Sequence, residues 1–153
     1  MKKFELTSET KINIFGKKLF RIKALISFGN VEAGETGGWV EKEENVNQSG
    51  DAWVFDNAEV FDNARVSDNA WVFGNARVSD NADYATIHGF GTQFRTTTFF
   101  RCKDKQVKVS CGCFYGTIPE FREQVKNTRK GKIAEEYLMI ADLMEKHFAE
   151  EAK

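Results

Sequence analysis

The clearest pattern along the chain is a six-residue repeat of apolar and polar positions over about residues 38–90. Valines recur six residues apart, with an alanine two residues before each: the valines are Val54, Val60, Val66, Val72 and Val78, with Tyr84 in the next place, and the alanines are Ala52, Ala58, Ala64, Ala70, Ala76 and Ala82. The first and third side chains of Ala-x-Val share one face of a short strand, so we expect both to enter a core. A fixed hexapeptide period predicts stacked units of a β-helix.

Polar pairs separate these arms and predict the corners between them. They read Asp-Asn or Gly-Asn and begin at Asp56, Asp62, Asp68, Gly74 and Asp80. Such residues tolerate unusual backbone angles and hydrogen-bond to their own backbone. Three arms of six residues then close a triangle of eighteen residues.

The eighteen-residue spacing brings the outward residues into favourable register. It places Trp53 on Trp71, Glu59 on Arg77 and Arg65 on Asp83. Aromatic and opposite-charge neighbours of this kind stabilise adjacent strands. A twelve-residue spacing would instead set Arg65 beside Arg77, which favours the triangular arrangement.

One wall of this triangle is expected to carry four outward rings, those of Trp53, Phe55, Trp71 and Phe73. Monomers rarely leave an apolar patch of that size bare, and Trp and Phe are typical interface anchors. We therefore predict that these four side chains bind a protein partner or mediate self-association into a homodimer.

The segment before the repeat, residues 1–37, predicts a β-hairpin that caps the stack. Two β-like runs surround Gly16-Lys17, and "GNVEAGETGG" then forms a glycine-rich bridge. Six apolar residues supply the expected buried side of the hairpin: Ile12, Ile14, Leu19, Phe20, Ile22 and Leu25. Residues 38–46 predict an irregular first coil, which an insertion near "NQSG" separates from the later register.

The segment after the repeat, residues 91–153, predicts a second β-hairpin followed by two helices. Strands are expected on both sides of Asp104-Lys105. Thr117 and Glu120 form a capping box before a helix over 118–127, whose buried face carries Ile118, Phe121 and Val125. A second helix over 133–150 shows an apolar stripe, comprising Tyr137, Ile140, Ala141, Met144 and Phe148.

Several stretches of the chain resemble a known family. "GGWVEKEENV", followed by "GDAWVFDNAEVFDNARV", looks like the hexapeptide-repeat left-handed β-helix proteins of phages and prophages, which are often loosely labelled polymer-forming. The tail, from "TTFFRCKD" to "KVSCGCFYGTIPEFREQV", resembles a module found after such repeats. The resemblance implies a mainly β fold with C-terminal α-structure: a short left-handed β-helix capped by the two flanking segments. It also implies a phage context, which favours inhibitors aimed at host proteins.

Composition and charge set the broad class. Apolar residues make up 41% and charged residues 29% of the 153, which indicates a globular chain. Three cysteines form no disulfide framework, and neither a signal peptide nor a membrane span is evident, so we expect a cytoplasmic protein without membrane contact.

Acidic residues concentrate in the middle of the chain, where residues 31–90 carry twelve acids against three bases. The candidate acidic surface consists of Asp56, Glu59, Asp62, Asp68, Asp80 and Asp83. Regular carboxylates could mimic nucleic acid, but solvated turn aspartates explain them equally well. The basic tail shows no clean cationic face, so direct nucleic-acid binding is not expected.

Candidate chemistry is sparse. His88 is the residue that a hexapeptide-repeat acyltransferase would use as a general base, and no nucleophile or acid accompanies it in the sequence. Cys102, Cys111 and Cys113 lack the spacing of zinc knuckles and read as small core residues. We expect no metal, no cofactor and no catalytic residue.

The resulting prediction is a non-enzymatic protein that acts by direct binding. Together with the phage resemblance, it indicates an inhibitor of a bacterial antiviral defence system, such as a CRISPR effector nuclease, in the host cytoplasm. Two alternatives stay open: a structural, polymer-forming scaffold that stacks end to end, and an acyltransferase-like enzyme that depends on His88.

Overall fold

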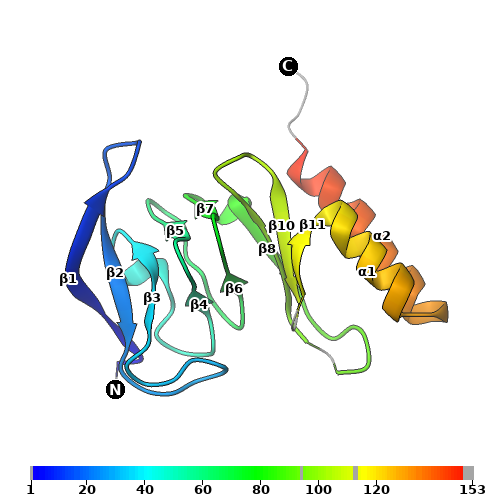
Figure 1. Ribbon diagram of the computed structural model, residues 1–153, viewed down its shortest axis with the longest axis horizontal. Helices are drawn as coiled ribbons and strands as arrows, with labels where there is room; N and C mark the ends of the chain where they lie inside the picture. The colour runs from blue at the N-terminus through cyan, green and yellow to red at the C-terminus, as the bar shows by residue number, and fades with distance from the viewer. Residues whose placement is uncertain (1, 94, 112–113, 150–153) are drawn as a thin grey trace.

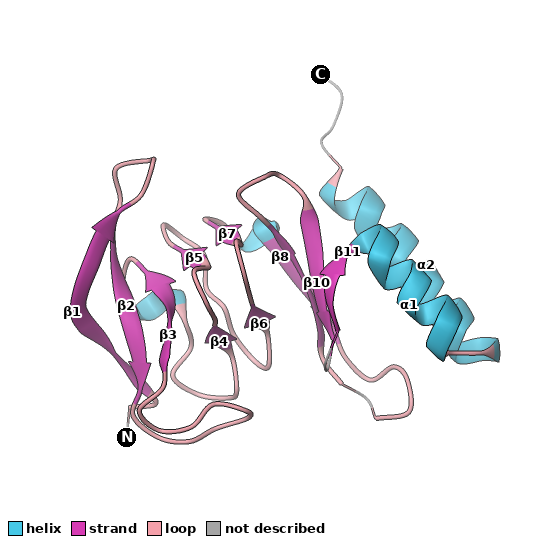
Figure 2. Ribbon diagram, in the orientation of Figure 1, coloured by secondary structure: helices cyan, strands magenta, loops and turns pink. Residues whose placement is uncertain are grey.

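A computed structural model gives the fold, and it describes residues 2–93, 95–111 and 114–149. The N-terminal strands and the C-terminal helices lie at opposite ends of an elongated molecule, with the repeat segment between them (Figure 1). The repeat segment, residues 38–90, is drawn mostly as loop and turn with very short strands (Figure 2).

The N-terminal hairpin is confirmed. Strand β1 (Phe4–Ile12) pairs antiparallel with β2 (Lys18–Ala24), and Gly16 adopts a φ of 79° in the connecting turn. That left-handed backbone angle costs glycine little.

The predicted buried side of the hairpin is only partly right. Leu19 and Ile22 are fully buried, but Ile12, Ile14 and Leu25 are exposed and Phe20 is half-buried. Ile12 is the last residue of β1 and pairs with Lys18 at the end of the hairpin, and Ile14 lies in the turn beyond it, so neither side chain reaches the core. Lys11 lies opposite Leu19, on the other face of the hairpin from Ile12, because successive side chains of a strand alternate.

The repeat segment contributes strands to two sheets. Strand β3 (Thr36–Val40) pairs antiparallel with β2 and parallel with β5 (Glu59–Val60), which pairs parallel with β7 (Arg77–Val78). This gives a five-stranded sheet in the order β1-β2-β3-β5-β7. Strands β4 (Trp53–Val54) and β6 (Trp71–Val72) form a separate parallel pair.

The inward positions of the first five repeat arms are confirmed as core, but the sixth is wrong, because Ala82 lies exposed in a 3₁₀ turn and Tyr84 is only half-buried. The alanines and valines of the five regular arms are all buried: Ala52, Ala58, Ala64, Ala70 and Ala76, with Val54, Val60, Val66, Val72 and Val78. They join one cluster with Phe4 and Ile22 of the N-terminal hairpin and Phe100 of the C-terminal sheet. The repeat therefore buries its apolar positions together with those of both flanking segments.

The predicted fold class, a mainly β chain built on a short left-handed β-helix, is wrong. The chain is a mixed α and β fold of three sheets with two C-terminal helices, and no closed or solenoid β-helix is found within the described residues. The repeat arms form strands of only two residues, too short to build continuous walls. One set extends the N-terminal antiparallel sheet, a second makes the isolated β4–β6 pair, and Val46 and Val66 share a single bridge.

The corner chemistry of the repeat is confirmed. Asp56, Asp62 and Asp68 adopt φ values of 56°, 52° and 56°, and Gly74 adopts 63°. These left-handed angles suit Asp and Gly. Asp80 instead caps a 3₁₀ turn (Asn81–Asp83) through its side chain, which accepts from the Ala82 N–H. A second 3₁₀ turn, Glu43–Asn45, follows β3.

The predicted C-terminal hairpin forms, and two further strands join it. The hairpin of β9 (Thr97–Arg101) and β10 (Val107–Cys111) is joined by β8 (Tyr84–Ile87) and β11 (Phe114–Thr117) in an antiparallel sheet ordered β11-β10-β9-β8. Phe99 and Val109 of this sheet pack against the helices. Cys113 lies outside the described residues.

Both predicted helices form. Helix α1 (Ile118–Thr128) begins at the Thr117–Glu120 capping box, and α2 (Gly131–Phe148) follows. Their predicted apolar faces are confirmed, because every residue of both is buried: Ile118, Phe121 and Val125 of α1, with Tyr137, Ile140, Ala141, Met144 and Phe148 of α2. None of the described helices has the length and apolar character needed to cross a lipid bilayer.

Candidate protein-binding surface

The predicted aromatic wall has the expected register but not the expected exposure. Trp53 lies opposite Trp71 in the parallel β4–β6 pair, and the rings of Phe55 and Phe73 stack with centroids 4.1 Å apart and planes 6° from parallel. Trp53, however, has no exposed surface. The prediction that it points into solvent is wrong, because the flanking chain packs over it.

The N-terminal segment covers Trp53. The ring centroids of Phe4 and Phe28 lie 5.7 and 5.2 Å from that of Trp53, both edge to face. The other three rings of the wall are half-buried, and Tyr115 of β11 packs 5.9 Å from Phe73. The wall is thus largely an internal contact between the repeat and its neighbours.

The predicted acidic surface is also broken up. Glu59 is buried, Asp62 forms an ion pair with Lys17 at 2.8 Å, and Asp83 pairs with Arg101 at 3.2 Å. The prediction that Asp83 pairs with Arg65 is wrong, since Arg101 of β9 occupies its carboxylate. Asp56 and Asp68 serve as corners, so the six acids form no continuous row of free carboxylates.

The most exposed large apolar side chains near the repeat gather at the tip of the N-terminal hairpin. Ile12, Ile14 and Phe15 are 65%, 76% and 59% exposed. The ring of Phe15 contacts that of Phe61 at 6.0 Å, and the Arg77 guanidinium lies 5.0 Å from it. We call Ile12, Ile14 and Phe15 the hairpin tip.

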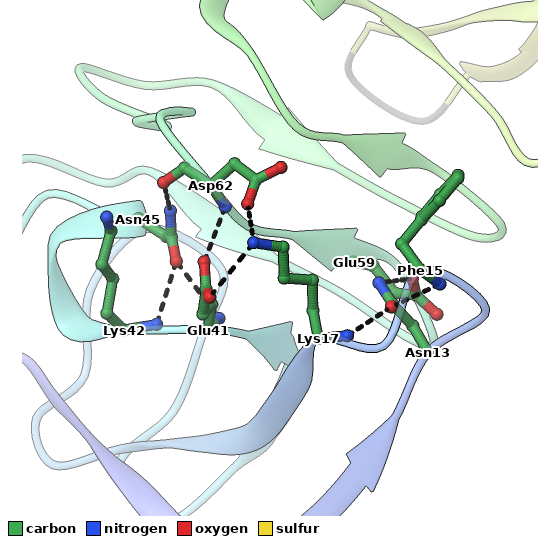
Figure 3. A network of polar contacts seen from close by, with 8 residues as sticks. All are labelled: Asn13, Phe15, Lys17, Glu41, Lys42, Asn45, Glu59 and Asp62. Carbon is green, nitrogen blue, oxygen red and sulfur yellow. Dashed lines mark hydrogen bonds and ion pairs between the residues drawn. The ribbon is translucent and has the colours of Figure 1, made fainter.

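Asn13 holds the backbone of the hairpin tip in one conformation. Its side-chain oxygen accepts hydrogen bonds from the N–H groups of Phe15 and Lys17, at 2.9 and 3.0 Å (Figure 3). Its own N–H donates to the Lys17 carbonyl at 3.0 Å, and the Gly16 N–H donates to the Asn13 carbonyl at 3.0 Å. Such an Asx turn fixes the direction in which the neighbouring side chains leave the loop.

A buried carboxylate anchors this turn to the rest of the molecule. Glu59 accepts from Lys11 at 3.0 Å, Lys103 at 3.1 Å and the side-chain nitrogen of Asn13 at 3.4 Å, with Arg77 at 3.6 Å. These residues belong to β1, the turn after β9, the hairpin turn and β7. Burial by itself raises the pKa of Glu59, but the hydrogen bonds from Lys11 and Lys103 outweigh it and hold the pKa below its usual value.

A second polar layer supports the hairpin tip from the repeat. Lys17 donates to Asp62, whose N–H donates to Glu41 Oε1 at 2.8 Å (Figure 3). The side-chain oxygen of Asn45 accepts a hydrogen bond from the Lys42 N–H at 2.9 Å, and its side-chain nitrogen donates to the Ala64 carbonyl at 2.8 Å. The hydrogen bond and the charge of Asp62 raise the pKa of Lys17 above its usual value.

This arrangement suits molecular recognition. A rigid turn presents three apolar side chains, and the cations around Glu59 outnumber its single carboxylate. Fixed apolar anchors lose little conformational freedom on binding. Surrounding cations favour a partner whose surface carries acids beside an apolar pocket.

The remaining chemical candidates stay apart. His88 is exposed, and its ring Nδ1 lies 3.4 Å from the Thr96 hydroxyl. No group of three or more His, Cys, Asp or Glu side chains is placed to hold a metal ion within the described ranges. Cys102 is buried in the core, and burial raises the pKa of its thiol to about 12.

The sequence interpretation missed the hairpin tip because it assigned Ile12 and Ile14 to the buried side. One signal was present: Lys11 and Lys17 flank the end of β1 and the turn that carries Ile14 and Phe15, where a hairpin runs past its core. No protein-family model and no curated protein matches the chain.

Proposed function

We propose that the chain is a non-enzymatic binding protein whose hairpin tip inserts into a protein partner. The observation that carries this proposal is the exposure of Ile12, Ile14 and Phe15 on a turn locked by Asn13. Binding energy concentrates in a few anchors of this kind. A chain that needed the tip only for folding would gain nothing by holding three apolar side chains in solvent.

The partner is expected to combine an apolar pocket with acidic residues around it. Lys17 and Lys18 follow the tip in sequence, and Arg77 lies against the ring of Phe15. Opposite charges across an interface raise the association rate and discriminate against partners of the wrong sign. Binding should accordingly weaken as the salt concentration rises.

The more specific form of the proposal is inhibition of a bacterial antiviral defence protein, such as an effector nuclease, by direct binding. Its support is the resemblance of the repeat sequence to phage-encoded proteins. A rigid turn that presents exposed apolar side chains suits an inhibitor that acts by occupying its target.

The test compares the wild type with Ile12→Ser/Ile14→Ser as immobilised baits in bacterial lysates, with captured proteins identified by mass spectrometry. The matched control is Leu25→Ser, which changes an exposed leucine at the far end of β2. We expect the tip variant to lose the captured partner and the control to keep it. Purified partner is then titrated to measure the dissociation constants, and a nuclease partner is assayed for cleavage.

Both variants should stay folded, because each exposed Ile or Leu contributes less than about 1 kcal/mol to stability. A tip variant that unfolds at the same urea concentration as the wild type and still binds the partner equally well would disprove the proposal.

A further inference from the structure

Helix α2 has a second apolar face that the described chain leaves uncovered. Its inner face, centred on Tyr137 and Met144, packs on the C-terminal core. On the outer face, Met139 and Leu143 are 69% and 59% exposed. They stand four residues apart, so they lie one turn from each other along the helix.

Charged residues continue this outer face in both directions. Each residue advances about 100° around an α-helix, which sets Lys132, Glu136, Met139, Leu143 and Lys146 within about 40° of one line. No ion pair within the described part of the chain uses Glu136 or Lys146. The apolar centre of the outer face is therefore flanked by Glu136 toward the N-terminal end and Lys146 toward the C-terminal end, and Lys132 lies one further turn beyond Glu136.

Arg122 of α1 forms ion pairs with two acidic residues on the flank of α2. It binds Asp142 at 2.8 Å and Glu145 at 3.0 Å. Those two carboxylates face the neighbouring helix and do not compete for the outer face. The charges next to the apolar centre of the outer face are thus those of Glu136 and Lys146, with Lys132 nearer the start of the helix.

The outer face is complementary to itself about the level of Ala141. Met139 and Leu143 lie two residues before and after Ala141, and Glu136 and Lys146 lie five residues before and after it. The members of each pair also lie on opposite sides of the central line, by about 20° for the apolar pair and about 40° for the charged pair. A two-fold axis through this point brings Met139 onto Leu143 of a second copy, and Glu136 onto Lys146 of that copy.

The opposite orientation is unfavourable. Two parallel α2 helices in register would set Glu136 against Glu136 and Lys146 against Lys146. Like charges at such positions repel, whereas the antiparallel register makes two attractive pairs. The charge pattern thus selects one orientation, and the two-fold symmetry agrees with the commonest form of homodimer.

We propose that the outer face of α2 binds the same face of a second copy of this chain. The two helices run antiparallel, and the contact is centred at the level of Ala141 along the helix axis. The 18-residue helix limits the contact to about 27 Å in length, so the dimer is weak and reversible. The hairpin tip lies at the opposite end of the molecule, which leaves two tips free in each dimer (Figure 1). The inference does not rest on the proposed function of the tip.

The decisive experiment exchanges charges and follows the oligomeric state by sedimentation velocity up to roughly 1 mM protein, a concentration suited to weak interfaces. The wild type should show a concentration-dependent dimer. Glu136→Lys alone and Lys146→Glu alone should each raise the dimer dissociation constant about tenfold or more, because two attractive contacts become repulsive.

Mixing the two variants restores both charge pairs between unlike chains. The mixture of Glu136→Lys and Lys146→Glu should therefore form a heterodimer, and the double variant should recover wild-type self-association. This recovery separates a lost interface from a failure to fold. Met139→Ser/Leu143→Ser should be monomeric while keeping the partner captured by the hairpin tip.

Two results would overturn the inference. One is a wild type that stays monomeric over the whole concentration range. The other is a dimer whose dissociation constant is the same for the wild type, both single charge variants and their mixture. Loss of partner binding in Ile12→Ser/Ile14→Ser with an unchanged dimer would leave the two proposals separately established.

Discussion

The carboxylate of Glu59 and the ammonium of Lys103 form an ion pair at 3.1 Å that joins the repeat to the C-terminal hairpin. Lys11 reaches the same oxygen from β1 at 3.0 Å. One buried carboxylate thus connects the three segments of the chain. It lies beside the turn that carries the hairpin tip, so its loss should affect both stability and binding.

Replacing Glu59 should be costly. Glu59→Gln keeps the shape of the side chain but leaves Lys11, Lys103 and Arg77 without their shared counter-charge. Breaking a buried pair costs about 3–5 kcal/mol, and the partial exposure of both lysines lowers our expectation to about 2 kcal/mol. Urea unfolding at pH 7 measures it, with Glu9→Gln, an exposed partner of Arg21, as the control. If Glu59→Gln and Glu9→Gln lowered the free energy of unfolding equally, Glu59 would not link the three segments as proposed.

The same residue predicts an acid-sensitive stability difference. The pKa of Glu59 is lower in the folded chain than in the unfolded chain. Its contribution is therefore complete above the unfolded pKa, near 4.3, and is lost as the pH falls through the folded pKa. The stability gap between wild type and Glu59→Gln should be constant from pH 7 to about pH 5 and shrink below about pH 4. A gap that stays constant to pH 3 would refute this assignment.

Trp53 should behave as a core residue. Trp53→Ala removes a fully buried ring between Phe4 and Phe28 and should cost about 3–5 kcal/mol. Trp53→Phe should cost less, because the indole N–H is buried without a hydrogen-bond partner among the described residues. Thermal or urea unfolding ranks the two against Ile14→Ala, which should be nearly neutral. A Trp53→Ala variant as stable as the wild type would show that Trp53 is not a buried core residue.

The six-residue period predicted the inward alanines and valines and the eighteen-residue pairing of Trp53 with Trp71, because both follow from local alternation and spacing. It did not predict where the outward side chains end up. Trp53 points away from the repeat, but Phe4 and Phe28 come from a segment that the period does not include. Glu59 is likewise outward in the repeat and is buried only because Lys11 and Lys103 reach it from both flanks.

The exposure of the hairpin tip was not predicted from the sequence. Alternation assigns residues to a face of β1, but it does not show where along the hairpin the core ends, and Ile12 and Ile14 lie past that end. The C-terminal helices, by contrast, were predicted well, because Thr117 and Glu120 mark the start of α1 and the apolar stripe of α2 follows the helical period.

Lys3 predicts a stability change at alkaline pH. Its buried ammonium donates to the carbonyls of Ala52 and Gly50, at 2.8 and 3.2 Å. Burial lowers the pKa of Lys3 to about 8, although Asp51 acts in the opposite sense. Between that pH and the unfolded pKa near 10.4, the folded chain releases a proton that the unfolded chain keeps, so this term stabilises the fold as the pH rises.

The comparison of wild type with Lys3→Met isolates this term from other titrating groups. The difference in unfolding free energy should move in favour of the wild type from pH 8 to pH 10, by at most about 3 kcal/mol. Urea unfolding at four pH values measures it, and Lys2→Met, which changes an exposed neighbour, is the control. If this difference did not change with pH, the pKa of Lys3 would not be lowered in the folded chain.

Gly74 is the corner at which the repeat replaces Asp with Gly, and the reason is Tyr115. A β-carbon on Gly74 would collide with the Tyr115 hydroxyl, and the residue also has a φ of 63°. Gly74→Ala should therefore destabilise the chain by about 2–4 kcal/mol, combining overpacking with left-handed backbone strain. In a Tyr115→Ala background the same substitution should cost only about 1 kcal/mol, because the strain remains and the collision does not. Urea unfolding of the four proteins completes this cycle. Equal costs in both backgrounds would mean that the ring of Tyr115 does not constrain Gly74.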